Sequence, residues 1–396
     1  MVRRVFITVA EVSGDRHAAQ LVRSLRQLDP ELMVEGLGGP EMAAAGAIIH
    51  HDTVTNAAMG WRGALRAVEV MKALRWVRQH FRTHRPDLQI GVDSPSMNFH
   101  FARVARRQGI PVMQYVAPQL WAWASWRMGK LKRWVDRVAC ILPFEREYFR
   151  RHGVDATFVG HPLFDELPID RTNGRSERFP SRPPVIGLLP GSRKSEAEHN
   201  FPHLLEVAAR IRQEFPDASF LVPTTAATHR IVEESSRRAA RTGLAVEIEQ
   251  DGFDQIIPRC DLCLTVSGTA TLHVAGFGVP MIVVYRINPL IWNAGARWIV
   301  RTRTFALVNL LAGGAGNGSP TGRLVPEFVP WYGSNEPVAR LAIDYLRHPE
   351  KLIEQRNRLR ELVRALDHPG ASMNAARLAL EMIDRPAGNM APEVSR

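Results

Sequence analysis

Hydrophobic positions along the chain fall into short apolar runs that alternate with segments of helical periodicity. The runs cover residues 5–10, 88–92, 111–116 and 137–142 in the first half, and 185–189, 219–222, 245–248, 261–266 and 281–284 in the second. Strand-length runs separated by helix-length segments indicate βαβ units, whose parallel strands form a sheet covered by helices on both faces. The pattern predicts an α/β protein with two doubly wound halves.

The stretch 166–184 interrupts this alternation, because it contains four prolines, an Asn-Gly pair and several charges. Such a composition is typical of a linker between domains. We therefore expect a first domain over residues 1–170 and a second over 182–365. The helical pattern near the end predicts a C-terminal helix over 366–385, which can pack back on the first domain, and a disordered tail over 386–396.

Composition places the chain among globular proteins, with 45% hydrophobic and 23% charged residues. The 51 basic residues exceed the 40 acidic ones, for a net charge of +11, and only five of the basic residues are lysines. Arginine binds phosphate oxygens in a bidentate manner, so the excess fits nucleic acid, an anionic membrane or phosphorylated small molecules. It also fits a simple bias in genome composition.

The cysteines and the apolar segments exclude several other classes. Three cysteines exclude a disulfide framework, and Cys260-x-x-Cys263 has no second pair, so we expect structural burial and a reduced compartment. The uncharged stretch 262–285 contains Gly, Pro and Thr, and fits strand, turn, helix and strand better than a membrane span. No signal peptide is visible, and no cluster has metal-binding spacing, so we expect a cytoplasmic protein without a tightly bound metal.

Polar residues follow the apolar runs of the first half, where ligands bind in parallel sheets. The segment Glu11-Val12-Ser13-Gly14-Asp15 follows the first run, and Asp93 follows the run 88–92. Asp93 is placed to take a proton from a substrate hydroxyl, or else to cap the next helix. The segment Gly36-Leu37-Gly38-Gly39-Pro40 can cradle a phosphate or sugar, or form only a tight turn.

Two turns in the second half have the composition of anion-binding sites. Gly191-Ser192-Arg193 follows the run 185–189, and Ser267-Gly268-Thr269 follows the run 261–266. Backbone N–H groups at a helix start, with an added guanidinium, bind phosphate well. Two such turns in one half point to a nucleoside diphosphate, although neither matches a P-loop.

Two segments combine cations with apolar or aromatic residues. Residues 61–82 predict an amphipathic helix with six cations and a single acidic residue, and residues 121–134 hold four tryptophans and four cations. Such segments can lie on anionic lipid. Ordinary packing of the apolar residues in the core is the alternative reading of both.

Taken in order, these motifs resemble the bacterial lipid-A-disaccharide synthase family. Further matches include Gly91-Val92-Asp93-Ser94-Pro95, Tyr115-Val116-Ala117-Pro118, Val159-Gly160-His161-Pro162, Leu189-Pro190-Gly191-Ser192-Arg193 and Asn309-Leu310-Leu311-Ala312-Gly313. The resemblance implies a GT-B glycosyltransferase, with two Rossmann-like halves facing across a cleft. It implies the joining of UDP-2,3-diacylglucosamine to 2,3-diacylglucosamine 1-phosphate, giving a β-1,6 disaccharide phosphate and UDP.

The resemblance also implies partners and domain roles. The first domain would bind the acylated glucosamine phosphate acceptor and face an anionic membrane, and the second would bind the UDP-sugar. The enzyme would act on the cytoplasmic face of the inner membrane, with no cofactor and no nucleic acid. A homodimer remains open.

Site residues follow from the same resemblance. Asp93 would be the general base, with Glu11 as its rival. The nucleotide diphosphate would contact Gly191, Ser192, Arg193, Ser267, Gly268, Thr269, His273 and Asn309. The acceptor would contact Ser13, Gly14, Asp15, Gly38, Gly39 and Met59. From the two basic segments described above, rather than from the resemblance, we expect the membrane to contact Trp61, Arg62, Arg66, Arg75, Arg78, Trp121, Trp123 and Trp126.

Departures from the family pattern leave other functions open. His273 stands where the family usually has Glu, and Gly314 where it has Arg. Both changes favour a related glycosyltransferase that uses another nucleotide sugar or lipid acceptor. A non-catalytic lipid-surface paralogue and a sugar-nucleotide epimerase of the same architecture are the remaining alternatives.

Overall fold

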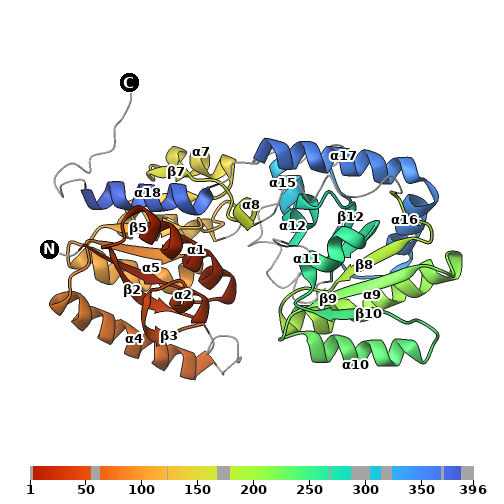
Figure 1. Cartoon of the computed structure of the whole chain (residues 1–396), viewed down its shortest axis with the longest axis horizontal. Coiled ribbons are helices and arrows are strands. Elements are labelled where there is room, and N and C mark those ends of the chain that lie inside the picture. Colours follow the sequence, from red (N-terminus) through yellow and green to blue (C-terminus); the bar gives the residue numbers. More distant parts are fainter. Residues whose placement is uncertain are drawn as a thin grey trace. The chain divides into compact units, whose positions relative to one another are not determined.

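The chain forms two compact units, each built on a parallel sheet (Figure 1). One unit comprises residues 1–166 and 368–396, and the other residues 167–367. The computed structural model describes residues 3–54, 63–122, 124–166, 179–266, 268, 270–286, 304–313, 323–366 and 370–384, with the side chains of 63–67 left out.

The first unit contains a seven-stranded sheet in the order β3-β2-β1-β4-β5-β6-β7, in which every neighbouring pair is parallel. Its elements are β1 (Arg4–Thr8), α1 (Val12–Leu28), β2 (Met33–Gly38), α2 (Pro40–Ala44), β3 (Ile48–Asp52), α4 (Gly63–Thr83), β4 (Leu88–Val92), α5 (Pro95–Arg107), β5 (Val112–Tyr115), η1 (Ser125–Arg127), α6 (Met128–Trp134), β6 (Arg137–Cys140), α7 (Pro143–Arg151), β7 (Ala156–Phe158), α8 (Leu163–Glu166) and α18 (Ala371–Asp384).

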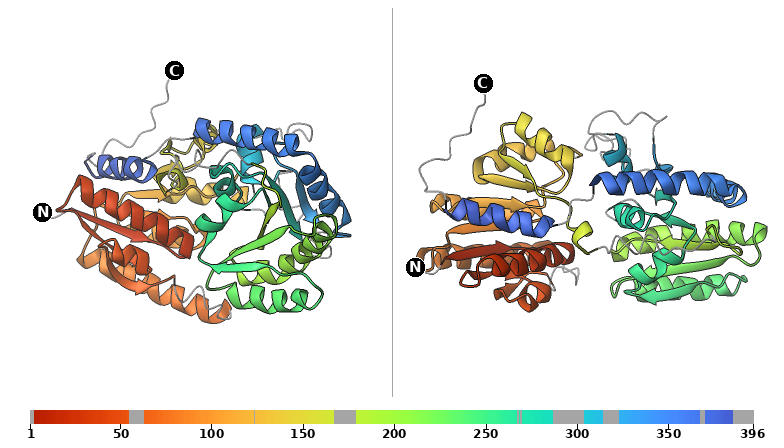
Figure 2. Two further views of the ribbon diagram at one scale, coloured as in Figure 1. Left: turned by 45° about the vertical axis from the view of Figure 1, so that its right-hand side comes forward. Right: turned by 45° about the horizontal axis from the view of Figure 1, so that its top comes forward.

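Strand β1 divides the core of this unit into two layers, because successive side chains point to opposite faces. Val5 and Ile7 pack with α1 and α18 on one face. Phe6 packs on the other face with residues of α4 and α5, including Phe81 at a ring-centroid distance of 4.9 Å. The helices therefore cover both faces of the sheet, as the alternating pattern predicts (Figure 2).

The last helix, α18, returns to the first unit and packs against α1. The carboxylate of Asp165 caps it by accepting backbone N–H groups of Gly370, Ala371 and Ser372 at 2.7–3.0 Å. A carboxylate at this position satisfies otherwise unpaired donors at a helix start. The cap joins the end of α8 to the start of α18.

The second unit contains a six-stranded sheet in the order β10-β9-β8-β11-β12-β13, again with parallel pairs. Its elements are β8 (Val185–Leu189), α9 (Lys194–Glu214), β9 (Ser219–Thr224), α10 (His229–Ala240), β10 (Glu247–Gln250), α11 (Phe253–Ile256), η3 (Ile257–Arg259), β11 (Leu262–Thr265), α12 (Ala270–Gly276), β12 (Met281–Arg286), α15 (Leu307–Gly313), β13 (Glu327–Trp331), α16 (Glu336–Arg347) and α17 (Pro349–Leu366).

Each sheet has a point where the order of its strands reverses. The reversal lies between β1 and β4 in the first unit, and between β8 and β11 in the second. Connections leave opposite faces of a sheet at such a point, which opens a crevice for ligands beyond the carboxyl ends of the strands. The residues that directly follow these four strands are therefore the first candidates for a site.

Candidate functional site

Glu11 and Asp93 follow the two strands at the reversal point of the first unit. Asp93 comes directly after β4, and Glu11 precedes α1 after β1. Both side chains are half-buried. The hydroxyl of Ser13 donates to Asp93 Oδ2 at 3.5 Å. A Cβ on Gly14 would lie 3.0 Å from Val9 Cγ1 and 3.5 Å from Asp93 Cβ, so Gly14 lies beside the end of β4 and its tightest contact is with Val9. The structure thus brings Ser13, Gly14 and Asp93 together.

The turn that carries Asp93 has an unusual backbone. Asp93 and Ser94 have φ angles of 52° and 34°, and left-handed conformations of this kind persist only where neighbouring groups hold them. The carbonyl oxygen of Asp93 accepts the side-chain amides of Asn98 at 2.7 Å and Gln114 at 3.1 Å. Sequence reasoning missed both amides, although Asn98 lies five residues beyond the carboxylate.

Asp15, Gly38 and Gly39 make structural contacts, and their assignment to the acceptor or the cleft stays a prediction. Asp15 is buried and accepts the backbone N–H groups of Gly39 at 2.9 Å, Glu41 at 3.0 Å and Met42 at 3.4 Å, so it caps α2. Burial raises the pKa of Asp15 above its ordinary value, and these donors offset part of the rise. The carbonyl of Gly38 accepts the N–H of Thr53. The glycine-rich segment is therefore a tight turn.

The turn after β8 combines a glycine with two exposed residues, and the carboxylate of Glu196 lies against it. Gly191 has a φ angle of 108°, a conformation that favours glycine. Ser192 is exposed, and so is Arg193, whose side chain is 69% exposed and donates to Glu196 Oε1 at 3.1 Å. Arg193 precedes the 21-residue helix α9, whose first N–H groups point away from the helix. This arrangement can bind an anion.

The turn after β11 lies beside it. Leu189 pairs with Thr265, and the N–H of Val266 donates to the carbonyl of Leu189 at 3.1 Å. Gly268 is exposed, and its carbonyl accepts the hydroxyl of Thr271 at 2.8 Å. The structure therefore brings the turn at 191–193 next to Gly268. Ser267 and Thr269 lie outside the described residues, as do Met59 of the first unit and Gly314.

The side chain of Asn309 is buried within its unit, and its assignment to the nucleotide stays a prediction. Its Oδ1 accepts the N–H groups of Leu324 at 2.8 Å and Val325 at 2.9 Å. Its Nδ2 donates to Val325 O at 2.8 Å and Glu327 Oε1 at 2.6 Å. These bonds use both donors and both acceptor sites of the amide. They lie at the start of β13. Because the strands are parallel, this is the end of the sheet opposite to the turns that follow β8 and β11.

His273 is held by neighbouring side chains of the same unit. Its Nε2 lies 2.9 Å from Asp254 Oδ1, and its ring lies between Phe253 and Phe277, at centroid distances of 4.5 and 5.5 Å. The pair joins α12 to α11. Asp254 is 58% exposed, so a carboxylate reaches solvent beside His273.

Comparisons with known proteins identify the family. The family model for lipid-A-disaccharide synthetase matches residues 5–377. The lipid-A-disaccharide synthase of Geobacter sulfurreducens is 36% identical over 389 residues, covering 96% of this chain and 98% of its own. That of Nitrosococcus oceani is 34% identical over 387 residues, covering 96% of each. The chain belongs to the lipid-A-disaccharide synthase family. The resemblance drawn from the motifs is confirmed.

Solved structures confirm the fold class of this family member. Acinetobacter baumannii MurG has a TM-score of 0.56 at 15% identity, covering 96% of this chain and 99% of its own. The calicheamicin glycosyltransferase CalG4 has a TM-score of 0.59 at 15% identity, covering 97% and 99%. At such low identity the likeness concerns the fold alone. Two Rossmann-like units with parallel sheets are the GT-B class that the sequence predicts.

The segment around Trp121 is partly internal in this family member. The indole N–H of Trp121 donates to Glu145 Oε1 at 3.1 Å, and its ring meets Phe144 edge-on at 5.1 Å. Glu145 is buried, and burial raises its pKa to about 8. Trp126, by contrast, is 65% exposed. The aromatic segment therefore combines core packing with one exposed ring. Trp123 lies outside the described residues.

Helix α4 leaves part of its apolar stripe uncovered within its unit. Val77 is buried, whereas Val68 is 43% and Met71 52% exposed. Arg75 and Arg78 are exposed. Trp61 and Arg62 lie outside the described residues, as does the side chain of Arg66. No helix among the described residues is long and apolar enough to cross a membrane.

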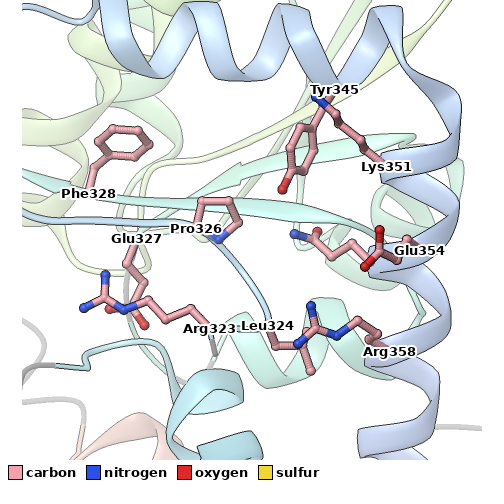
Figure 3. Close-up of a pocket in the computed structure, with 10 residues that line it drawn as sticks. Arg323, Leu324, Pro326, Glu327, Phe328, Tyr345, Lys351, Glu354 and Arg358 are labelled. Atoms are coloured by element: carbon pink, nitrogen blue, oxygen red, sulfur yellow. The ribbon is translucent and has the colours of Figure 1, made fainter. Parts of the chain in front are cut away.

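A pocket of about 370 Å³ in the second unit is separate from the candidate site (Figure 3). Arg323, Tyr345, Lys351 and Arg358 line it, with the segment that leads into β13. Because β12 and β13 are parallel, this segment lies where the strands begin, whereas Gly191 lies beyond the carboxyl ends of the strands. The pocket does not contain any of the residues that sequence reasoning assigned to catalysis or to the nucleotide.

Proposed function

We propose that the chain is an inverting glycosyltransferase that joins UDP-2,3-diacylglucosamine to 2,3-diacylglucosamine 1-phosphate. The products are the β-1,6-linked lipid A disaccharide 1-phosphate and UDP. Membership of the lipid-A-disaccharide synthase family supports this activity. One structural observation carries the assignment of roles: carboxylates follow the reversal-point strands of the first unit, and an anion-binding turn follows those of the second.

Asp93 is the proposed general base. Its carboxylate takes the proton of the acceptor 6-hydroxyl, whose oxygen attacks the anomeric carbon while the bond to UDP breaks. The attack inverts the configuration at that carbon. The hydroxyl of Ser13, at 3.5 Å, can orient the carboxylate. Glu11 follows the neighbouring strand β1 and is the second candidate for the same role.

The turn at 191–193 is the proposed diphosphate site. Negative charge grows on the departing UDP, and backbone N–H groups with a guanidinium stabilise it without rearranging. Arg193 can reorient for this purpose, since its side chain is 69% exposed. Gly268 adds backbone from the adjacent turn. No cofactor takes part in this chemistry.

The α4 face is the proposed membrane contact; we define it as Val68, Met71, Arg75 and Arg78. Two exposed apolar side chains beside two exposed arginines suit a peripheral site on an anionic bilayer. The acylated acceptor is a membrane lipid, so contact with the cytoplasmic face of the inner membrane would bring the first unit to its substrate. Exposed Trp126 is a further candidate for this contact.

A second candidate function is transfer from another nucleotide sugar, and the His273–Asp254 pair favours it. The family glutamate is replaced by an imidazole that is held at 2.9 Å from a different carboxylate. A changed group beside the nucleotide site alters the preference among donors. A panel of UDP-sugars, with the diacylglucosamine donor included, separates the two candidates.

The deciding experiment supplies purified protein with UDP-2,3-diacylglucosamine and the phosphorylated acceptor, and measures UDP release together with the linkage formed. We expect UDP in equal amount to a β-linked disaccharide. UDP without disaccharide would indicate hydrolysis, and an α-linkage would overturn the single-displacement mechanism. No turnover with this donor, but turnover with another UDP-sugar, would establish the second candidate.

A further inference from the structure

Glu35, His50 and His80 converge on one point of the first unit, away from the strand ends described above. Glu35 lies on β2, His50 on β3 and His80 on α4. His50 Nε2 lies 2.9 Å from Glu35 Oε2, and His80 Nε2 lies 3.1 Å from Glu35 Oε1. Among the described residues these three offer ligand atoms that all lie within 4.8 Å of one another. Figure 1 shows the three elements as neighbours in this unit.

The spacing of these atoms is close to that of a tetrahedral metal site. Zinc bonds to nitrogen and oxygen measure about 2.0–2.2 Å, which places two ligand atoms roughly 3.3–3.6 Å apart. The two imidazole nitrogens lie 2.9 and 3.1 Å from different oxygens of Glu35, and one ligand atom from each of the three residues lies within 4.8 Å of the others, so a shared ion requires small movements of these side chains. Two imidazoles and one carboxylate form a ligand set that zinc uses with its fourth position open to water.

The surroundings hold the ligands in place. The Trp76 ring stacks on His80 at 4.6 Å and lies 4.7 Å from His50. The side chains of Glu35 and His80 are only 4% and 10% exposed, and that of His50 is 25% exposed. Ligands fixed by packing lose little freedom when they bind an ion. The guanidinium of Arg4 lies 4.0 Å from Glu35 Oε1 and opposes the binding of a cation.

We propose that Glu35, His50 and His80 bind one Zn²⁺ ion, which fastens α4 to strands β2 and β3. Each histidine binds through Nε2 and carries its proton on Nδ1. The ion would tie together three elements of one unit, because each of its three ligands comes from a different element. The proposal does not depend on the proposed transferase activity, since none of the three residues belongs to the candidate site.

Cobalt(II) titration of the metal-stripped, untagged full chain tests the proposal directly, because tetrahedral Co²⁺ with nitrogen ligands absorbs visible light. We expect saturable absorption at one ion per chain, lost when Zn²⁺ is added. Glu35→Gln and His50→Gln should each weaken binding by at least about 10-fold, the lower range for removing even an outer partner of a ligand. His84→Gln is the matched control, because His84 stacks on His80 at 5.0 Å without joining the group. Absence of saturable binding by the parent, or unchanged affinity in both ligand variants, would overturn the proposal.

A second measurement needs no substitution, in case a ligand variant fails to fold. Diethyl pyrocarbonate modifies imidazole nitrogens, and peptide mass spectrometry locates the modified histidines. Zn²⁺ should protect His50 and His80 of the parent chain and leave exposed His84 reactive. Equal modification of His50 and His80 with and without Zn²⁺ contradicts the site, whatever the variants do.

Discussion

Replacing Asp93 with asparagine removes the proposed base and keeps the turn that holds it. Asn, like Asp, adopts left-handed backbone more readily than other side chains, so the φ of 52° is tolerated. The amide oxygen can still accept the Ser13 hydroxyl. The backbone carbonyl keeps its bonds to Asn98 and Gln114. We expect the free energy of unfolding to change little.

The expected loss of activity is large, because a general base contributes about 10²- to 10⁴-fold to turnover. That range corresponds to roughly 2.7–5.5 kcal/mol in the activation free energy. Asp93→Ala should lose as much turnover, but alanine in this left-handed turn also costs roughly 1–2 kcal/mol of stability. The asparagine variant therefore separates chemistry from folding.

The assay measures UDP release at saturating substrate, UDP affinity by titration and stability by urea unfolding. Asp93→Asn should lower the rate of UDP release. It should leave UDP affinity and stability unchanged, because the proposed UDP site lies in the other unit. Ser13→Ala is the control for an altered turn, and we expect it to retain most turnover. If the asparagine variant keeps more than a tenth of parental turnover while Glu11→Gln abolishes it, the base is Glu11 and the assignment to Asp93 is wrong.

Four further predictions concern Arg193, Asn309, Glu145 and the two arginines of the α4 face. Arg193→Ala should weaken UDP binding by roughly 1.5–3 kcal/mol, the range for a charged hydrogen bond, without changing stability; unchanged affinity in a UDP titration would remove it from the site. Asn309→Ala should lower the free energy of unfolding by on the order of 3 kcal/mol, because it leaves the buried hydrogen-bond partners of the amide unpaired. An unchanged urea midpoint contradicts its structural role. Burial raises the pKa of Glu145 to about 8 from 4.5, so the native state keeps a proton that the unfolded chain releases. The free energy of unfolding should therefore fall as pH rises from about 5 to 8, and Glu145→Gln should flatten that slope in urea unfolding at several pH values. Replacing Arg75 and Arg78 with serine should weaken binding to anionic vesicles by about 1 kcal/mol for each arginine at low salt; equal sedimentation of parent and variant would refute the α4 contact.

Most interior strands could be predicted from the sequence, with β2 as the exception, whereas the edge strands β3, β7 and β13 could not. All five residues of β4 are buried, so its apolar run is continuous. Strand β3 lies at the edge of its sheet and reads Ile-Ile-His-His-Asp, with both ends exposed. Strand β13 is also an edge strand, and each of its residues is half-buried. Only one side of an edge strand pairs, so the surroundings impose a weaker pattern on its residues.

The metal-binding group was out of reach of sequence reasoning for a related reason. Its residues are separated by 15 and 45 positions from Glu35, and spacing rules detect ligands only within one turn or loop. The group forms because β3 pairs with β2 and α4 packs beside them. His50 lies on β3 and His80 on α4, and both elements meet β2 only in the folded unit.

Residue type at a strand end did not distinguish ligand-binding groups from structural ones, and exposure does. Asp15 and Arg193 both follow a first strand and both have the chemistry to meet a substrate. Asp15 is 1% exposed and bound by three backbone N–H groups, whereas the Arg193 side chain is 69% exposed. A buried, fully bonded carboxylate would have to break its own contacts to bind a ligand, at a cost of about 1–3 kcal/mol for each group left unpaired. Asp93 resembles Arg193 rather than Asp15, because within the part of the chain that the structure describes its half-buried carboxylate accepts one long hydrogen bond, from Ser13, and its backbone carbonyl is bound by other residues. The proposed base is therefore held by its main chain and free at its side chain, which is the combination that proton transfer to a bound hydroxyl requires.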